Sequence, residues 1–186
     1  YLPGLSLSGL LREVVKRQRR LTAVSAVAIG AQIAAGLHAA HETKDSGGQL
    51  LNVVHRDISP QNIILSANGD IKRIDFGIAK ARDRLVKTRA NQVKGKLRYM
   101  APEQISSIKN SGPRSDIYAL GVLMFQALAG DIPFSERNPG KLLYQIVLGQ
   151  GIALKSLCPD VPPAVAEVVH RSMAAKRADR YAAVEL

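Results

Sequence analysis

An 18-residue stretch without charge, residues 23–40, restricts the folds that are open to this chain. A run of this length is a candidate membrane span. Alanine and glycine supply most of it, and Ser25, Gln32 and His38 interrupt it, so its transfer into lipid gains little free energy. We therefore predict one long helix over residues 22–42, buried on most sides inside a folded domain.

The remaining pattern predicts a mainly helical body with a small hairpin. Leucine and valine recur at helical spacing over residues 7–14 and basic residues follow, which indicates a short helix. Residues 44–49 form a surface loop. Three further segments are apolar and strand-like: 50–54, 63–65 and 71–74. The last two flank the turn signal Asn68-Gly69-Asp70 and predict two strands joined as a hairpin.

Downstream of the hairpin, residues 75–103 show no sustained period and predict a long functional loop. Helical patterns then cover residues 115–129, 139–148 and 163–174. With 186 residues, the chain suffices for one core or for one large lobe of a bigger domain. The single cysteine, Cys158, excludes a disulfide framework and a multi-cysteine zinc site. The net charge of +11 favours an anionic partner.

Four short motifs stand in a fixed order along the chain. His55-Arg56-Asp57 follows the apolar run, with Asn62 five positions after Asp57, and Asp75-Phe76-Gly77 begins thirteen positions after Asn62. Ala101-Pro102-Glu103 closes the long loop, and Asp116 and Gly121 stand in the motif that follows. This order and local structure resemble the protein kinase family. The Ser59-Pro60-Gln61 and Lys94-Gly95-Lys96 segments are most similar to bacterial members of the serine/threonine branch.

The resemblance implies an α+β, mainly α fold: the C-terminal helical lobe of a protein kinase, with a small β-hairpin at the catalytic cleft. Residues 1–186 would form a partial kinase domain, with a catalytic loop at 53–62, an activation segment at 75–103 and a helical subdomain at 114–186. The sequence contains no Gly-x-Gly-x-x-Gly loop and no strand lysine paired with a helix glutamate. We therefore expect the N-terminal β lobe to be absent, and the chain alone to bind ATP poorly.

Phosphoryl transfer from ATP requires cations and a base near the acceptor hydroxyl, and these residues offer both. By the resemblance, Asp57 is the catalytic base, while Asn62 and Asp75 hold Mg²⁺ through hard oxygen ligands. The opening residues 1–4 resemble the hinge between lobes. Backbone groups of Leu2 would then meet adenine, Ser6 would lie near the ribose, and Ile64 would form the apolar floor. The predicted cofactor-binding residues are Leu2, Ser6, Gln61, Asn62, Ile64 and Asp75.

Two positions depart from the usual serine/threonine kinase pattern. Ser59 stands two past Asp57, where that pattern has a lysine that touches the transferring phosphate. Lys96 stands where the pattern has a threonine. We hypothesise that Lys96 restores the missing positive charge from the other side of the cleft and is catalytic, since stabilisation depends on where the charge lies. The alternative is that Lys96 is one more solvated lysine of a basic loop.

Arg56, next to the catalytic base, resembles the subclass that phosphorylation of the long loop switches on. Between Asp75 and Glu103 the hydroxyl side chains are Thr88 and Tyr99. The family uses a tyrosine near position 99 structurally, so Thr88 is the predicted regulatory phosphosite. The alternative is an unmodified loop threonine.

Other residues have predicted structural roles. Glu103 and Arg180 resemble the family's ion pair between the loop end and the last helices, and Asp116 would bind the backbone near His55 and Arg56. His38 and His41 lie three apart without a third ligand in sight, so we expect packing or surface roles for them. The predicted structural residues are His55, Phe76, Gly77, Glu103, Asp116 and Arg180.

The favoured function is therefore a fragment of an ATP- and Mg²⁺-dependent serine/threonine protein kinase. The alternatives are a small-molecule, aminoglycoside-type phosphotransferase and a non-catalytic kinase-like binding module. Tyrosine specificity is less expected, because the catalytic loop lacks the alanine and arginine pattern of that branch. Expected partners are a protein substrate with a Ser or Thr acceptor and the missing N-terminal lobe, with a kinase dimer as a further option and no specific nucleic acid. The expected location is the cytoplasm, including the cytoplasmic part of a membrane-anchored kinase.

Overall fold

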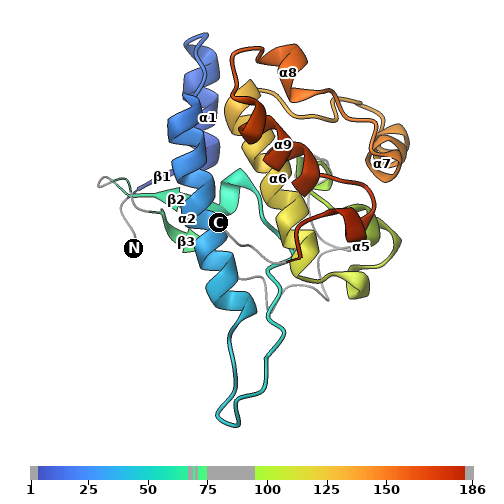
Figure 1. Cartoon of the computed structure of the whole chain (residues 1–186). Coiled ribbons are helices and arrows are strands. Elements are labelled where there is room, and N and C mark those ends of the chain that lie inside the picture. Colours follow the sequence, from blue (N-terminus) through green and yellow to red (C-terminus); the bar gives the residue numbers. More distant parts are fainter. Residues whose placement is uncertain (1–3, 67–68, 70, 75–94, 183–186) are drawn as a thin grey trace.

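The computed structural model of the chain describes residues 4–66, 69, 71–74 and 95–182 (Figure 1). These residues form a mainly helical body with a small antiparallel sheet at one side. Helix α6 (Pro113–Ala129) lies at its centre, and eleven of its residues are buried. Helices α2 (Ala23–His41) and α9 (Pro163–Ser172) pack against α6 and complete the core. The predicted fold class, α+β and mainly α, is confirmed.

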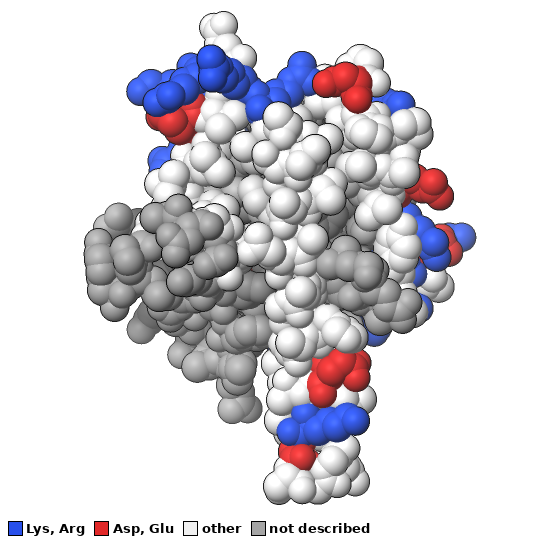
Figure 2. Space-filling view, turned by 60° about the vertical axis from the view of Figure 1, so that its left-hand side comes forward, with Lys and Arg blue, Asp and Glu red and all other residues white. Residues whose placement is uncertain are grey.

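Helix α2 confirms the predicted long helix, but its burial differs from the prediction. The Thr22 hydroxyl caps it by accepting the Ser25 backbone N–H. A stripe at helical spacing, which includes Ile33 and Leu37, is fully buried against the core, whereas Val24 on the opposite side is 80% exposed. Burial on most sides was therefore wrong, because neighbouring elements cover one stripe only. Figure 2 shows the uncharged outer face of this helix, with basic side chains gathered at the end where α1 (Leu7–Lys16) leads into it.

By length and mean hydropathy of 1.5, α2 also qualifies as a candidate membrane span. Core helices of soluble proteins meet the same criteria. Its buried stripe packs on α6, as the preferred interpretation of residues 23–40 predicts.

The sheet has three strands in the order β1-β2-β3, all antiparallel: β1 (Leu5–Ser6), β2 (Ile63–Leu65) and β3 (Ile71–Ile74). The predicted hairpin of β2 and β3 is confirmed. Strand β1 was not predicted, because two residues are too short to show an alternating pattern.

The predicted strand-like segment 50–54 is wrong. It forms only one isolated bridge, between Leu50 and Lys44. The backbone of Asn52 has a φ of 49°, in the left-handed region that a strand excludes.

Helices α1 and α7 (Pro139–Leu148) lie where the sequence predicts them. Helix α6 begins two residues earlier than predicted, at Pro113, and α9 ends two residues earlier, at Ser172. Both differences lie within the usual fraying of helix ends. Short elements were missed: α5 (Pro102–Ser106), α8 (Leu154–Leu157) and the 3-10 turns Pro60–Asn62, Ile108–Asn110 and Arg177–Asp179.

Candidate active site

Asp116 fixes the loop that carries the candidate catalytic residues. It lies in the first turn of α6 and is 1% exposed. Its two carboxylate oxygens accept the backbone N–H groups of His55 and Arg56, each at 2.8 Å. His41, at the end of α2, places Nε2 2.9 Å from the same carboxylate. One buried carboxylate therefore joins α2, α6 and residues 55–56.

His41 is the site residue that sequence reasoning missed. The sequence offered no signal for it beyond an apolar helix that ends in histidine. Its side chain is 7% exposed, whereas His38, three positions earlier, is exposed. The described part of the chain contains no group of three His, Cys, Asp or Glu residues that could hold a metal ion.

Arg56 occupies a left-handed conformation, with a φ of 66°. Such a conformation is uncommon for a residue with a side chain and persists where surrounding contacts impose it. Here the Arg56 N–H is bound by Asp116. The turn brings the chain to Asp57 while the Arg56 side chain stays exposed.

Asp57, Asn62 and Lys96 form the centre of the site. The Asn62 side-chain amide donates to the Asp57 backbone carbonyl at 2.7 Å and to Oδ2 of its carboxylate at 3.1 Å. The Lys96 ammonium lies 2.7 Å from the same Oδ2. Both residues follow Asp57 in the sequence: Asn62 belongs to the 3-10 turn five positions later, and Lys96 lies 39 positions later, near the end of the long loop. The side chain of Asp57 is 14% exposed, so these contacts are partly desolvated and the charge interactions are stronger than in water.

Ser59, two positions after Asp57, is buried, with 1% of its surface exposed. Its hydroxyl has no hydrogen-bond partner among the described residues. Since Ser59 carries no charge, Lys96 is the cation that the described structure places on Asp57.

The strand pairing brings together two of the predicted nucleotide-binding residues. Ser6 of β1 pairs with Ile64 of β2, and both are partly buried. The Ser6 hydroxyl accepts the Gly9 N–H and so caps α1. Gly4 approaches this pair so closely that a Cβ there would lie 2.7 Å from Ile64 Cγ2. Gln61 is exposed and lines a cavity between α1 and the 3-10 turn.

Several predicted residues lie outside the described residues. They are Leu2, Asp75, Phe76, Gly77 and Thr88. Of the two predicted Mg²⁺ ligands the structure thus describes Asn62. Its amide nitrogen is committed to Asp57, which leaves the amide oxygen, a hard ligand of the type that Mg²⁺ prefers. The described donor therefore fits the ion.

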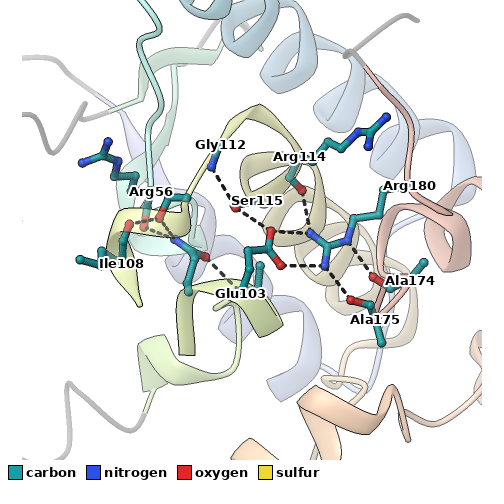
Figure 3. A network of polar contacts seen from close by, with 12 residues as sticks. Arg56, Glu103, Ile108, Gly112, Arg114, Ser115, Ala174, Ala175 and Arg180 are labelled. Carbon is teal, nitrogen blue, oxygen red and sulfur yellow. Dashed lines mark hydrogen bonds and ion pairs between the residues drawn. The ribbon is translucent and has the colours of Figure 1, made fainter. Parts of the chain in front are cut away.

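Glu103 and Arg180, predicted as an ion pair, meet in a two-pronged contact (Figure 3). Nη1 and Nη2 of Arg180 lie 2.8 and 2.9 Å from the two oxygens of Glu103. Burial alone would raise the pKa of Glu103, but hydrogen bonds from Arg180 and Ser115 hold that pKa below its ordinary value. This pair ties α5 to the residues that follow α9.

The fold and the site define a class of protein, and comparison with known proteins shows the same class. Residues 3–186 match the protein kinase domain, and the chain belongs to this family. The small-molecule phosphotransferase alternative is not favoured.

Several similar proteins are named as kinases of bacteria. The chain is 42% identical over its whole length to a protein named tyrosine-protein kinase MasK of Myxococcus xanthus, of which it covers 28%. It is 33% identical to serine/threonine-protein kinase PknL of Mycobacterium tuberculosis, with 94% of this chain and 41% of that protein covered. With serine/threonine-protein kinase PknH of the same species it shares 37% identity, over 92% of this chain and 26% of that protein. The chain thus spans less than half the length of these relatives.

Proposed function

We propose that this chain provides the catalytic loop of an ATP- and Mg²⁺-dependent protein kinase that phosphorylates serine or threonine. The single observation that supports the proposal best is the partly buried Asp57 carboxylate, which contacts both Asn62 and Lys96. The names of PknL and PknH support a Ser/Thr acceptor, whereas the name of MasK favours tyrosine. The acceptor is therefore part of the test.

In the proposed reaction, the acceptor hydroxyl oxygen forms a bond to the γ-phosphorus and gives its proton to Asp57. The bond from that phosphorus to the bridging oxygen breaks, and ADP leaves. The Asn62 amide oxygen would hold Mg²⁺, which would supply positive charge to the phosphates. Asn62 also orients the Asp57 carboxylate through its amide nitrogen. Asp116 holds the backbone of the catalytic loop by accepting the N–H groups of His55 and Arg56.

Lys96 supplies positive charge to the same reaction. Its ammonium lies 2.7 Å from Asp57 Oδ2, and its side chain is 36% exposed and so stays accessible from solvent. Charge that develops on the transferring phosphoryl group is stabilised by a positioned cation, whichever segment of the chain carries it. Lys96 thereby fills the role that the uncharged Ser59 cannot fill.

The test is phosphate transfer from γ-labelled ATP by the full-length protein to peptides with Ser, Thr or Tyr acceptors, with an aminoglycoside as the non-peptide acceptor. We expect transfer to Ser and Thr, a loss of roughly 10²–10⁴-fold in kcat for Asp57→Asn, and about 10²-fold for Lys96→Met, with partial recovery in Lys96→Arg. The control is Lys109→Met, which removes an exposed lysine elsewhere. Full activity of Asp57→Asn would refute the proposal, and full activity of Lys96→Met would refute the role of Lys96.

A further inference from the structure

A cavity of about 490 Å³ lies beside the catalytic loop. Pro60 and Gln61 form its wall on the loop side, and Tyr99 and Gln126 form another part. Pro60 follows Asp57 by three residues, which places their Cα atoms within about 11 Å of each other. When the acceptor hydroxyl of a protein substrate lies at Asp57, a substrate residue two to four positions from the acceptor would therefore lie at this cavity.

The cavity has a basic wall on α1. Arg12 and Lys16 both line it, and they stand four apart, on the same face of the helix. No aspartate or glutamate is among the lining residues that the structure describes. Neither basic side chain makes an ion pair or hydrogen bond with another described residue, and both are exposed.

The acidic groups nearby are engaged elsewhere. Glu13 lies on the next face of α1 and binds Arg17 at 2.8 Å. Asp131 follows the lining residue Gly130, and its carboxylate accepts the Ile132 N–H. Like charges four apart destabilise a helix slightly, and an anion between Arg12 and Lys16 would offset that cost.

Neutral hydrogen-bonding groups complete the wall. The hydroxyl of Tyr99 donates to the side-chain oxygen of Gln126, which leaves the amide group of Gln126 as a donor. Burial raises the pKa of Tyr99, so its hydroxyl stays protonated and adds no negative charge. The amide of Gln61 is exposed at the same cavity.

We propose that this cavity is a substrate-selecting subsite that takes an acidic side chain, Asp, Glu or a phosphorylated residue, two to four positions from the phosphorylated Ser or Thr of the protein substrate. Arg12 and Lys16 are its specificity-determining residues. The inference rests on the proposed kinase function and adds the class of substrate to it. Because both side chains are exposed, the selection depends on ionic strength and weakens as salt screens the charges.

Two measurements on the full-length protein test the subsite. The first is the binding of fluorescent peptides to the Asp57→Asn variant, which does not depend on catalysis. The second is kcat and KM of the unsubstituted protein with the same peptides. Each peptide has one serine, and Glu, phosphoserine, Gln or Arg occupies the positions two to four residues to one side of it or to the other.

We expect the Glu and phosphoserine peptides to bind about fivefold more tightly than the Gln peptide, with the difference in KM and not in kcat. The double substitution Arg12→Glu with Lys16→Glu is expected to reverse the order in favour of the Arg peptide. Arg19→Gln, an exposed arginine just beyond α1 that does not line the cavity, is the matched control and is expected to leave the order unchanged.

Equal binding of all four peptides would overturn the subsite, as would an unchanged order after the double substitution. Displacement of the Glu peptide by inorganic phosphate at equal concentration would also overturn it, because the cavity would then be a general anion site. Charge-dependent binding without phosphate transfer by the unsubstituted protein would retain the subsite and refute the proposed kinase function.

Discussion

The substitution Arg180→Met tests how far the site depends on the buried ion pair behind it. The Arg180 side chain is fully buried and donates five hydrogen bonds, which is the whole donor capacity of a guanidinium. Two go to Glu103, and the others go to the backbone carbonyls of Ala174, Arg114 and Ala175 at 2.7, 3.0 and 3.1 Å. The guanidinium also lies over the Tyr118 ring.

Methionine fills part of the volume but leaves three carbonyls without the Arg180 donor and leaves the Glu103 carboxylate without its cation, with the Ser115 hydroxyl as its remaining described side-chain donor. Removal of one partner of a buried ion pair costs about 3–5 kcal/mol of the free energy of unfolding. In a chain of this size that loss corresponds to a fall in Tm of roughly 6–20 °C. Urea unfolding monitored by circular dichroism measures the free energy of unfolding, and calorimetry measures the Tm.

Arg171→Met is the matched control, because Arg171 is exposed and its described contact is the Tyr181 ring, at 4.3 Å. We expect it to lose less than about 1 kcal/mol. A second variant separates charge from packing: Arg180→Met combined with Glu103→Met removes the uncompensated carboxylate and is expected to recover part of the loss. If Arg180→Met is no less stable than Arg171→Met, or if the double variant recovers nothing, the reasoning is wrong.

Two further predictions concern the packing around α9. A Cβ at Gly121 of α6 would lie 2.8 Å from Ser172 Cβ, so Gly121→Ala is expected to cost about 1–3 kcal/mol by urea unfolding; Gly140→Ala inside α7 is the control, and equal effects of the two would contradict the prediction. His170 accepts the Leu154 N–H at the start of α8, and burial lowers the pKa of this histidine. Stability is therefore complete above the ordinary histidine pKa of about 6.5 and falls as the pH drops below it; the same slope in His170→Gln would exclude this histidine as its source.

The long helices and the hairpin were predictable because their signals are local. Helix α2 has an uncharged run with a threonine cap, and β2 and β3 flank a turn signal. Which side of α2 is exposed was not predictable, because that depends on how α6 and its neighbours pack against the helix. Strand β1 exists only through its pairing with β2, and a two-residue segment carries no period of its own.

In the candidate site, too, the features with a local sequence signal were predictable and those that depend on packing were not. The order of the motifs marks Asp57 and Asn62, and their contact follows from the tight 3-10 turn between them. The approach of Lys96 to Asp57 spans 39 positions and was a hypothesis from one unusual residue at position 59. The contact of His41 with Asp116 and the cavity beside Arg12 and Lys16 had no sequence signal, because each forms only where separate elements meet after folding.

Asp116 connects the fold to the candidate site, because its single carboxylate contacts both the helical core and the catalytic loop. Its two oxygens accept the backbone of residues 55 and 56 and contact His41 of α2. Backbone N–H groups in a buried place need such an acceptor, because an unpaired one costs about as much as a lost hydrogen bond. The left-handed turn at Arg56, directly before Asp57, is therefore maintained by the packing of α2 on α6. The uncharged helix α2, which limits the possible folds of this chain, thus also helps to position Asp57.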